Sequence, residues 1–141
     1  MPNPGSLVSV DVIALRYNPD LRRVEMATKP RTTEPLLGKP ALPGVLLQEG
    51  ERLAAAAHRA VTTKVGFDVS ALGQLTVFDQ PNRDPRGYSL SVAMWAVGDG
   101  DADWYGFDDA PNLAFDHNVM LFECRPLLVD MLWRDLEFTR A

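Results

Sequence analysis

Apolar positions along the chain follow the two periods that distinguish strands from helices. A β-branched run at residues 7–17, then turn residues and a shorter run at 24–27, predict an opening hairpin. Residues 88–97 alternate between apolar and polar positions, which predicts a long strand. The remaining predicted segments are strands at 41–47, 72–78 and 104–107 and proline-rich loops at 29–43 and 79–87.

Two stretches have helical periodicity. Within residues 44–67, small and apolar side chains recur on one helix face, and Gly66 stands where a left-handed C-cap is expected. The second helix is predicted to begin near Asp116, a residue suited to an N-cap, and to continue towards the end of the chain. Pro126 predicts a kink or a restart of that helix. The stripe of the first helix comprises Leu53, Ala56, Ala57, Ala60 and Val61.

The order of these elements predicts one α/β domain over residues 1–141. A hairpin, a helix, further strands and a last helix favour a mixed β-sheet packed between helices. A chain of 141 residues is long enough to bury a proper core, and its sequence has no internal repeat.

Composition and charge narrow the classes of function. A net charge of -5 argues against general binding to a nucleic-acid backbone, although a few local cations can still hold a small anion. Cys124 is the only cysteine, which excludes an intrachain disulfide. No stretch approaches the roughly 20 apolar residues of a membrane span, and the N-terminus lacks the pattern of a secretion signal. We therefore expect a cytoplasmic protein without membrane contact.

The first helical stretch and its preceding loop resemble a Nudix box. The family pattern is Gly-x5-Glu-x7-Arg-Glu-U-x-Glu-Glu-x-Gly-U, where U is aliphatic. Glu51, Arg59, Val61, Gly66 and Phe67 occupy its Glu, Arg, aliphatic, Gly and apolar positions, with one extra residue between the loop glycine and the glutamate. The three later glutamate positions hold Ala60, Thr63 and Lys64.

This resemblance implies the Nudix fold, an α/β/α sandwich with a mixed β-sheet. In the family the replaced carboxylates hold Mg²⁺ or Mn²⁺ and help to activate water, so the resemblance implies impaired hydrolysis and no cofactor unless activity persists. Glu51 and Arg59 are then the catalytic remnant, or else an ion pair on a solvated helix face. A metal site improvised from Glu49 and Glu51, or from acidic turns at 101–109, is a further alternative, but the sequence does not bring these carboxylates together.

Two further segments are similar to one branch of the family. They are the loop 83–87 (RDPRG), followed by a strand containing SVA, and the segment 113–117 (LAFDH). The branch contains ADP-ribose pyrophosphatases and Nudix-related regulators of NAD metabolism, and the resemblance covers about residues 8–136. In the regulators, ADP-ribose-type ligands are effectors and a winged-helix DNA-binding domain follows. Because the sequence stops at Ala141, direct nucleic-acid binding is not expected.

The loop 83–87 supplies candidate ligand contacts. Arg83 and Arg86 carry guanidinium groups, which bind diphosphate oxygens through paired hydrogen bonds, and Asp84 lies between them. The alternative is that Asp84 and Arg86 only brace the loop. Trp104 is a candidate for stacking on adenine, although tryptophan more often belongs to a core or an interface. Structural or capping roles are expected for the two histidines, His58 and His117.

Three functional hypotheses follow. The first is a Nudix-fold domain with impaired hydrolysis that binds an ADP-ribose-like nucleoside diphosphate. The second is an active hydrolase that cleaves the diphosphate bond of ADP-ribose or a related nucleotide, with Glu51 as the remaining carboxylate. The third is an interaction domain that forms a homodimer, or binds another protein, through the apolar helix face at residues 127–136.

Overall fold

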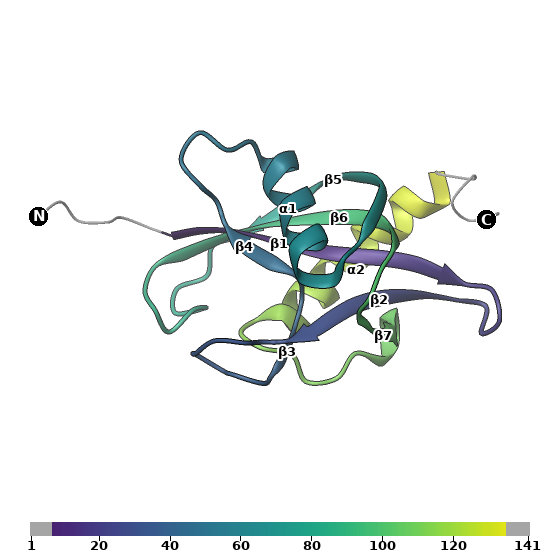
Figure 1. Ribbon diagram of the computed structural model, residues 1–141, viewed down its shortest axis with the longest axis horizontal. Helices are drawn as coiled ribbons and strands as arrows, with labels where there is room; N and C mark the ends of the chain where they lie inside the picture. Colours follow the sequence, from purple (N-terminus) through teal and green to yellow (C-terminus); the bar gives the residue numbers. More distant parts are fainter. Residues whose placement is uncertain (1–6, 135–141) are drawn as a thin grey trace, which may run out of the picture.

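The computed structural model describes residues 7–134, with side chains described through Met131. Its elements follow in chain order, with short connections around two longer loops (Figure 1). They are β1 (Leu7–Asn18), β2 (Arg23–Pro30), β3 (Pro40–Ala41), β4 (Gly44–Leu46), α1 (Leu53–Val65), β5 (Asp68–Phe78), β6 (Ser89–Asp99), β7 (Asp103–Gly106), the 3₁₀ turn η1 (Phe107–Asp109) and α2 (His117–Arg134).

The strands of the described chain form one mixed sheet. Its order is β3-β2-β1-β6-β5, with β4 paired to β1 and β7 paired to β2. The central pair, β1 and β6, is parallel over nine residue pairs from Leu7↔Ser89 to Leu15↔Val97. The other pairings are antiparallel. Parallel strands are usually covered on both faces, and this sheet is no exception.

The two helices cover opposite faces of the sheet (Figure 1). Along β1, Val10 and Val12 belong to the core cluster of α1, whereas Ile13 and Leu15 belong to the cluster of α2. Successive strand side chains point to opposite faces, so an unbroken apolar run is what a strand buried on both sides requires. The same holds for β6, where Ala93 and Met94 are both buried; the strand predicted at residues 88–97 is present, but it is covered on both faces.

The segment 29–43 is a hairpin rather than a long loop. Strand β2 extends to Pro30, which pairs with Pro40 on β3, and a compact loop spans residues 31–39. The amide of Arg31 donates to the carbonyl of Lys39, and the amide of Gly38 donates to the carbonyl of Arg31. The prolines suggested an irregular segment. However, Pro30 and Pro40 lie at the end of a short strand pair on the edge of the sheet, where the backbone N–H group that proline lacks is not needed for pairing.

Helix α2 continues through Pro126 without the predicted restart. Proline removes one amide donor, which leaves the carbonyl of Phe122 without its usual partner. Both residues are exposed, so water can satisfy that carbonyl. Leu136, the last residue of the predicted apolar face, lies outside the described residues.

Between residues 7 and 134 no helix is both long enough and apolar enough to span a membrane.

Candidate functional site

Helix α1 has the boundaries that the box resemblance predicts. Gly66 adopts a left-handed conformation with φ 55°, and its amide donates to the carbonyl of Val61. A residue with a side chain would be strained in this conformation, which explains glycine at the C-cap. At the other end, Arg52 is extended and its side chain makes no capping hydrogen bond. The helix therefore depends on other contacts to fix its first turn.

Glu51 and Arg59 supply those contacts. Arg59 Nε donates to Glu51 Oε2 and Nη2 donates to Glu51 Oε1, both at 2.9 Å, while Nη2 also reaches the carbonyl of Leu46 at 2.9 Å. The amide of Gln48 donates to Glu51 Oε1 at 3.1 Å. The bond from Arg59 lowers the pKa of Glu51, and Glu51 raises that of Arg59. The pair fastens β4 and the following loop to α1.

The substituted box positions have three different environments. Ala60 is fully buried in the apolar cluster between α1 and the sheet. The hydroxyl of Thr63 donates to the carbonyl of Arg59 at 2.7 Å, and Lys64 is exposed with a cationic head. Divalent cations such as Mg²⁺ need several oxygen ligands, whereas α1 itself carries no carboxylate and that of Glu51, just before the helix, is already bound by Arg59. The residues of α1 therefore do not fit a divalent metal.

The alternative acidic sites are dispersed. Glu49 is exposed beside the Glu51 pair, Asp101 lies 3.8 Å from Lys29, and Asp108 is bound by Arg125. Within the described part of the chain, no group of three His, Cys, Asp or Glu side chains is arranged to hold a metal ion.

In the loop 83–87, the two arginines have different environments. The side chain of Arg83 is only 4% exposed, and it binds Asp116 through Nε at 2.9 Å and Nη2 at 2.7 Å. Arg86 is 39% exposed and binds Asp84 through Nε at 3.0 Å and Nη2 at 2.7 Å. Burial alone would raise the pKa of Asp84, but the bonds from Arg86 outweigh it and lower that pKa. Arg83 is thus an internal anchor of the loop, and Arg86 faces solvent.

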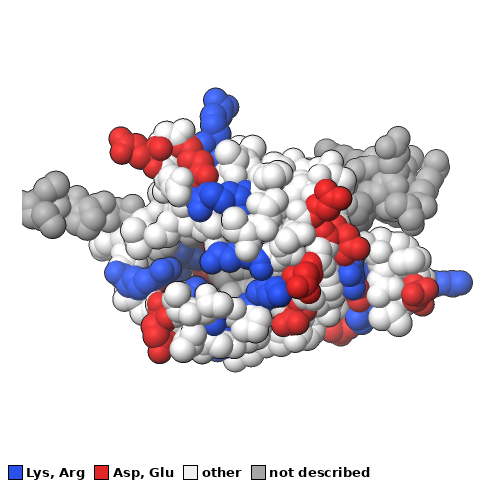
Figure 2. All heavy atoms as spheres, viewed as in Figure 1, with Lys and Arg blue, Asp and Glu red and all other residues white. Residues whose placement is uncertain are grey.

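Phe115 brings a second exposed loop to Arg86. The guanidinium carbon of Arg31 lies 4.7 Å from the centre of the Phe115 ring, and that of Arg86 lies 5.5 Å from it. Figure 2 shows Lys and Arg side chains gathered on the face that carries β3 and β4. Nothing in the sequence singled out Arg31 among the cations of its loop, because its spacing does not indicate contact with residues 86 and 115.

A buried polar network lies beside these residues. Ser9 and Ser91 both donate to Asp11 Oδ2, and Nε2 of His117 lies 3.6 Å from Asp11 Oδ1. The amide of Leu42 donates to His117 Nδ1, so the proton of the neutral imidazole resides on Nε2. Burial lowers the pKa of His117, and the nearby carboxylate of Asp11 opposes this only in part. The structural role expected of His117 agrees with these contacts.

Trp104 lies in a different environment from the arginine loop. Its indole N–H donates to the carbonyl of Gly100 at 3.2 Å, and the guanidinium carbon of Arg16 lies 4.1 Å from the ring centre. Phe67 contacts the ring at a tilt, with centroids 6.0 Å apart. These contacts belong to the α1 side of the sheet, whereas Arg83 and Arg86 contact the segment that begins α2. The structure does not bring Trp104 together with the 83–87 loop.

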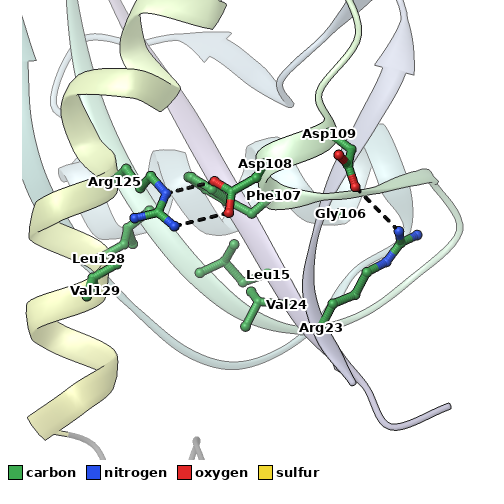
Figure 3. Close-up of a pocket in the computed structure, with 10 residues that line it drawn as sticks. All are labelled: Leu15, Arg23, Val24, Gly106, Phe107, Asp108, Asp109, Arg125, Leu128 and Val129. Carbon is green, nitrogen blue, oxygen red and sulfur yellow. Dashed lines mark hydrogen bonds and ion pairs between the residues drawn. The ribbon is translucent and has the colours of Figure 1, made fainter. Parts of the chain in front are cut away.

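A hollow of about 340 Å³ lies between the β1–β2 hairpin, η1 and α2 (Figure 3). Apolar side chains such as Leu15, Val24 and Leu128 form its wall. The Arg125–Asp108 pair lies at its rim, with bonds of 2.7 and 3.0 Å. Asp108 and Asp109, from the acidic turns considered as an improvised metal site, line this hollow, whereas none of the predicted catalytic or ligand-binding residues does.

Comparisons with known proteins provide relatives of known role. No protein-family model matches the chain. It is 30% identical over 133 residues to the ADPR responsive transcriptional repressor NtrR of Acinetobacter baylyi, a match covering 84% of this chain and 52% of the relative. It is also 30% identical over 101 residues to the ADP-ribose pyrophosphatase of Methanocaldococcus jannaschii, covering 64% of this chain and 60% of that protein. The chain thus spans a little over half the length of these relatives.

The fold is similar to a solved domain with a bound nucleotide. The NUDIX domain of Shewanella oneidensis NrtR, crystallised with ADP ribose, superposes with a TM-score of 0.78 at 25% identity. The match covers 90% of this chain and 94% of that domain. The expected α/β fold with a mixed sheet is thereby confirmed.

Proposed function

Since this chain is a Nudix domain, we propose that it binds an ADP-ribose-like nucleoside diphosphate and is impaired or inactive as a metal-dependent hydrolase. Two relatives are named for ADP-ribose, one as a repressor that responds to it and one as a pyrophosphatase. A structurally similar domain was crystallised with that nucleotide. These names support the ligand class, and the residues of this chain support the loss of hydrolysis.

One observation supports the proposed loss of metal-dependent hydrolysis. Ala60 occupies a box position where a carboxylate is expected, and its side chain is fully buried among apolar residues. A Nudix relative was solved with a manganese ion, so divalent metals occur in the family. At α1 of this chain, Glu51 is the one box carboxylate, and Arg59 binds both of its oxygens. The box thus keeps its scaffold function and lacks a ligand set for a metal.

Ligand binding is assigned to the exposed arginine of the loop 83–87. Arg86 uses Nε and Nη2 for Asp84, which orients its guanidinium and leaves Nη1 for a phosphate oxygen. Arg83 and Asp84 act on the ligand indirectly, because both are engaged in ion pairs that shape the loop. Stacking of adenine on Trp104 would require Arg16 to leave the ring face.

Titration with ADP-ribose, NAD and nucleoside diphosphate sugars tests this function, with and without Mg²⁺ or Mn²⁺, while products are followed. We expect saturable binding of ADP-ribose with little or no product. Rapid metal-dependent formation of AMP would replace the proposal with the active hydrolase. Absence of binding to every nucleotide would reject the ligand as well.

A specific observation favours an interaction domain as a second candidate, although through a different face of α2 than the predicted residues 127–136, of which Leu128 is buried in the core. The outer face of α2 exposes Val119, Phe122 and Val129, with Phe122 80% exposed. These residues follow one another at helical spacing, so they form an apolar stripe opposite the buried face. A homodimer through this stripe predicts that Phe122→Glu lowers the mass measured in solution. A wild-type chain that is already monomeric at high concentration would reject it.

A further inference from the structure

We propose that Arg31 and Arg86, both stacked on Phe115, bind the diphosphate of the nucleotide without a divalent metal. This inference rests on the proposed function. It assigns to Arg31, which lies outside both the box and the 83–87 loop, the neutralisation of charge that metal ions provide elsewhere in the family.

The two guanidinium groups come from loops that are distant in sequence. Arg31 begins the loop of the β2–β3 hairpin, and Arg86 lies in the loop between β5 and β6. Both lie over the ring of Phe115, at 4.7 and 5.5 Å from its centre. Each guanidinium is attracted to the ring by a cation–π interaction, so Phe115 connects the two loops.

Each guanidinium is already oriented while hydrogen-bond donors remain. Arg31 Nε donates to the carbonyl of Pro35 at 2.7 Å. Within the described structure, Nη1 and Nη2 of Arg31 donate no hydrogen bond. Arg86 is held by Asp84 through Nε and Nη2, and its Nη1 donates no hydrogen bond to any of residues 7–134. Donors that are fixed before binding lose less conformational entropy when the ligand arrives.

The backbone of Phe115 is held in an unfavourable conformation that supports this arrangement. Its φ of 51° lies in the left-handed region, which is unfavourable for a residue with a side chain. Neighbouring bonds impose it, because the amide of Ala114 donates to the carbonyl of Pro40 and the amide of His117 donates to the carbonyl of Ala114. The first of these bonds also fixes the base of the Arg31 loop to the ring.

The charges at this site favour Arg31 as the stronger contact. Asp84 offsets much of the charge of Arg86, whereas the side chain of Arg31 is bound to a neutral carbonyl. Two guanidinium groups present paired donors that match diphosphate oxygens. A free Mg²⁺ ion binds the same oxygens and would compete with the arginines. Binding should therefore be as strong in a chelator as with magnesium, or stronger.

The experiment is calorimetric titration of the whole chain with inorganic diphosphate and, separately, with ADP-ribose, each in EDTA and in excess Mg²⁺. Arg31→Gln should weaken both ligands by about tenfold or more, because a charge-assisted pair of hydrogen bonds is lost. Arg22→Gln, an equal change of charge at the exposed β1–β2 turn, should leave affinity within about twofold of wild type. Arg31→Lys should be intermediate.

Phe115 is a positioning residue. Its variants distinguish a loss of arginine positioning from a loss of folding stability. Phe115→Leu should weaken diphosphate binding at a temperature where it is fully folded, and Phe115→Tyr should restore the affinity. If wild type binds ADP-ribose while Arg31→Gln matches Arg22→Gln, this inference fails and the proposed function stands. An absolute requirement for Mg²⁺ would also overturn it. If wild type binds no nucleotide in either buffer, both fail.

Discussion

The box helix, α1 with Glu51 before it, and the Phe115 cluster, made of Arg31, Arg86 and Phe115, each contain an arginine held by a carboxylate through Nε and Nη2, but the surroundings of the two pairs differ. Arg59 and Glu51 connect segments eight residues apart, and Ala60 beside them is buried in the apolar core. Arg86 and Asp84 lie next to a second guanidinium, that of Arg31, over one ring. The Arg59–Glu51 pair connects α1 to β4 and the loop after it, whereas the Arg86–Asp84 pair leaves the guanidinium N–H groups of Arg86 facing solvent. The residues that resemble the Nudix box and the exposed guanidinium group of Arg86 are therefore in different places.

The largest expected effect comes from returning a glutamate to the box at Ala60. The new carboxylate would be buried among apolar side chains without a partner, so Ala60→Glu should lower the free energy of unfolding by about 3 kcal/mol or more. Urea denaturation measures this. Thr63→Glu, on the exposed face of the same helix, should change stability by less than about 1 kcal/mol. Equal stability of the two variants would show that the apolar packing of α1 does not prevent a metal site.

A slightly smaller effect is expected at Gly44, which lies against the network beside the Phe115 cluster. A methyl group there would collide with Oδ1 of Asp11, so Gly44→Ala should cost about 2 kcal/mol in urea denaturation. The same change should cost clearly less in an Asp11→Ala background, because the colliding atoms are then gone. Additive costs would mean that the strain arises elsewhere.

The pH dependence of stability tests the neutral state of His117. Its pKa is lowered in the folded protein, so below the unfolded value near 6.5 the unfolded chain binds more protons than the folded one. Stability should be constant above that value and fall as the pH drops, by at most about 1.4 kcal/mol per pH unit. Chemical denaturation between neutral and mildly acid pH measures this slope. His117→Asn should flatten it and His58→Asn, at an exposed position, should not; equal slopes in both variants would contradict the assignment.

The smallest effect is expected from Glu51→Gln, which removes the charge from the box pair. The pair lies at the surface and is partly exposed, 13% for the side chain of Glu51 and 31% for that of Arg59, so the midpoint of thermal unfolding should fall by roughly a few degrees. The pKa of Glu51 is lowered in the folded state, so this difference should be present at neutral pH and vanish as acid protonates the carboxylate. ADP-ribose affinity should not change, and a large loss of it would return the ligand site to the box helix.

Local signals were sufficient for most of the fold. Gly66 marked the end of α1 through its conformational freedom, and the ion pair considered as the alternative interpretation of Glu51 and Arg59 is present in the structure. The limits of β5 and the β2–β3 hairpin were missed, because β5 begins at Asp68 with polar and small residues and the hairpin carries prolines. Whether a segment forms a helix or a strand depends mainly on its own residues. Where a strand begins and ends depends on the neighbouring strand with which it pairs.

The candidate site was less accessible to sequence reasoning, for a physical reason. Arg31, Arg86 and Phe115 meet only because the hairpin base bonds to the segment that begins α2, a contact between chain segments about 75 residues apart, as loop closure permits at modest cost. Arg83 had the residue type of a ligand contact, but its burial against Asp116 is a property of the packed structure. The roles assigned to Glu51, Arg59, Arg83, Asp84, Arg86 and Trp104 in binding remain predictions.

The parallel pairing of β1 with β6 also has a consequence for how the chain is made. β6 follows β1 by about 80 residues, and such distant pairings form slowly because a long loop must close first. During synthesis, the apolar strand β1 therefore waits, with its hairpin partner and α1, until β6 has left the ribosome. A stall before Ser89 would leave β1 without its parallel neighbour, an unpaired edge of the kind that promotes aggregation.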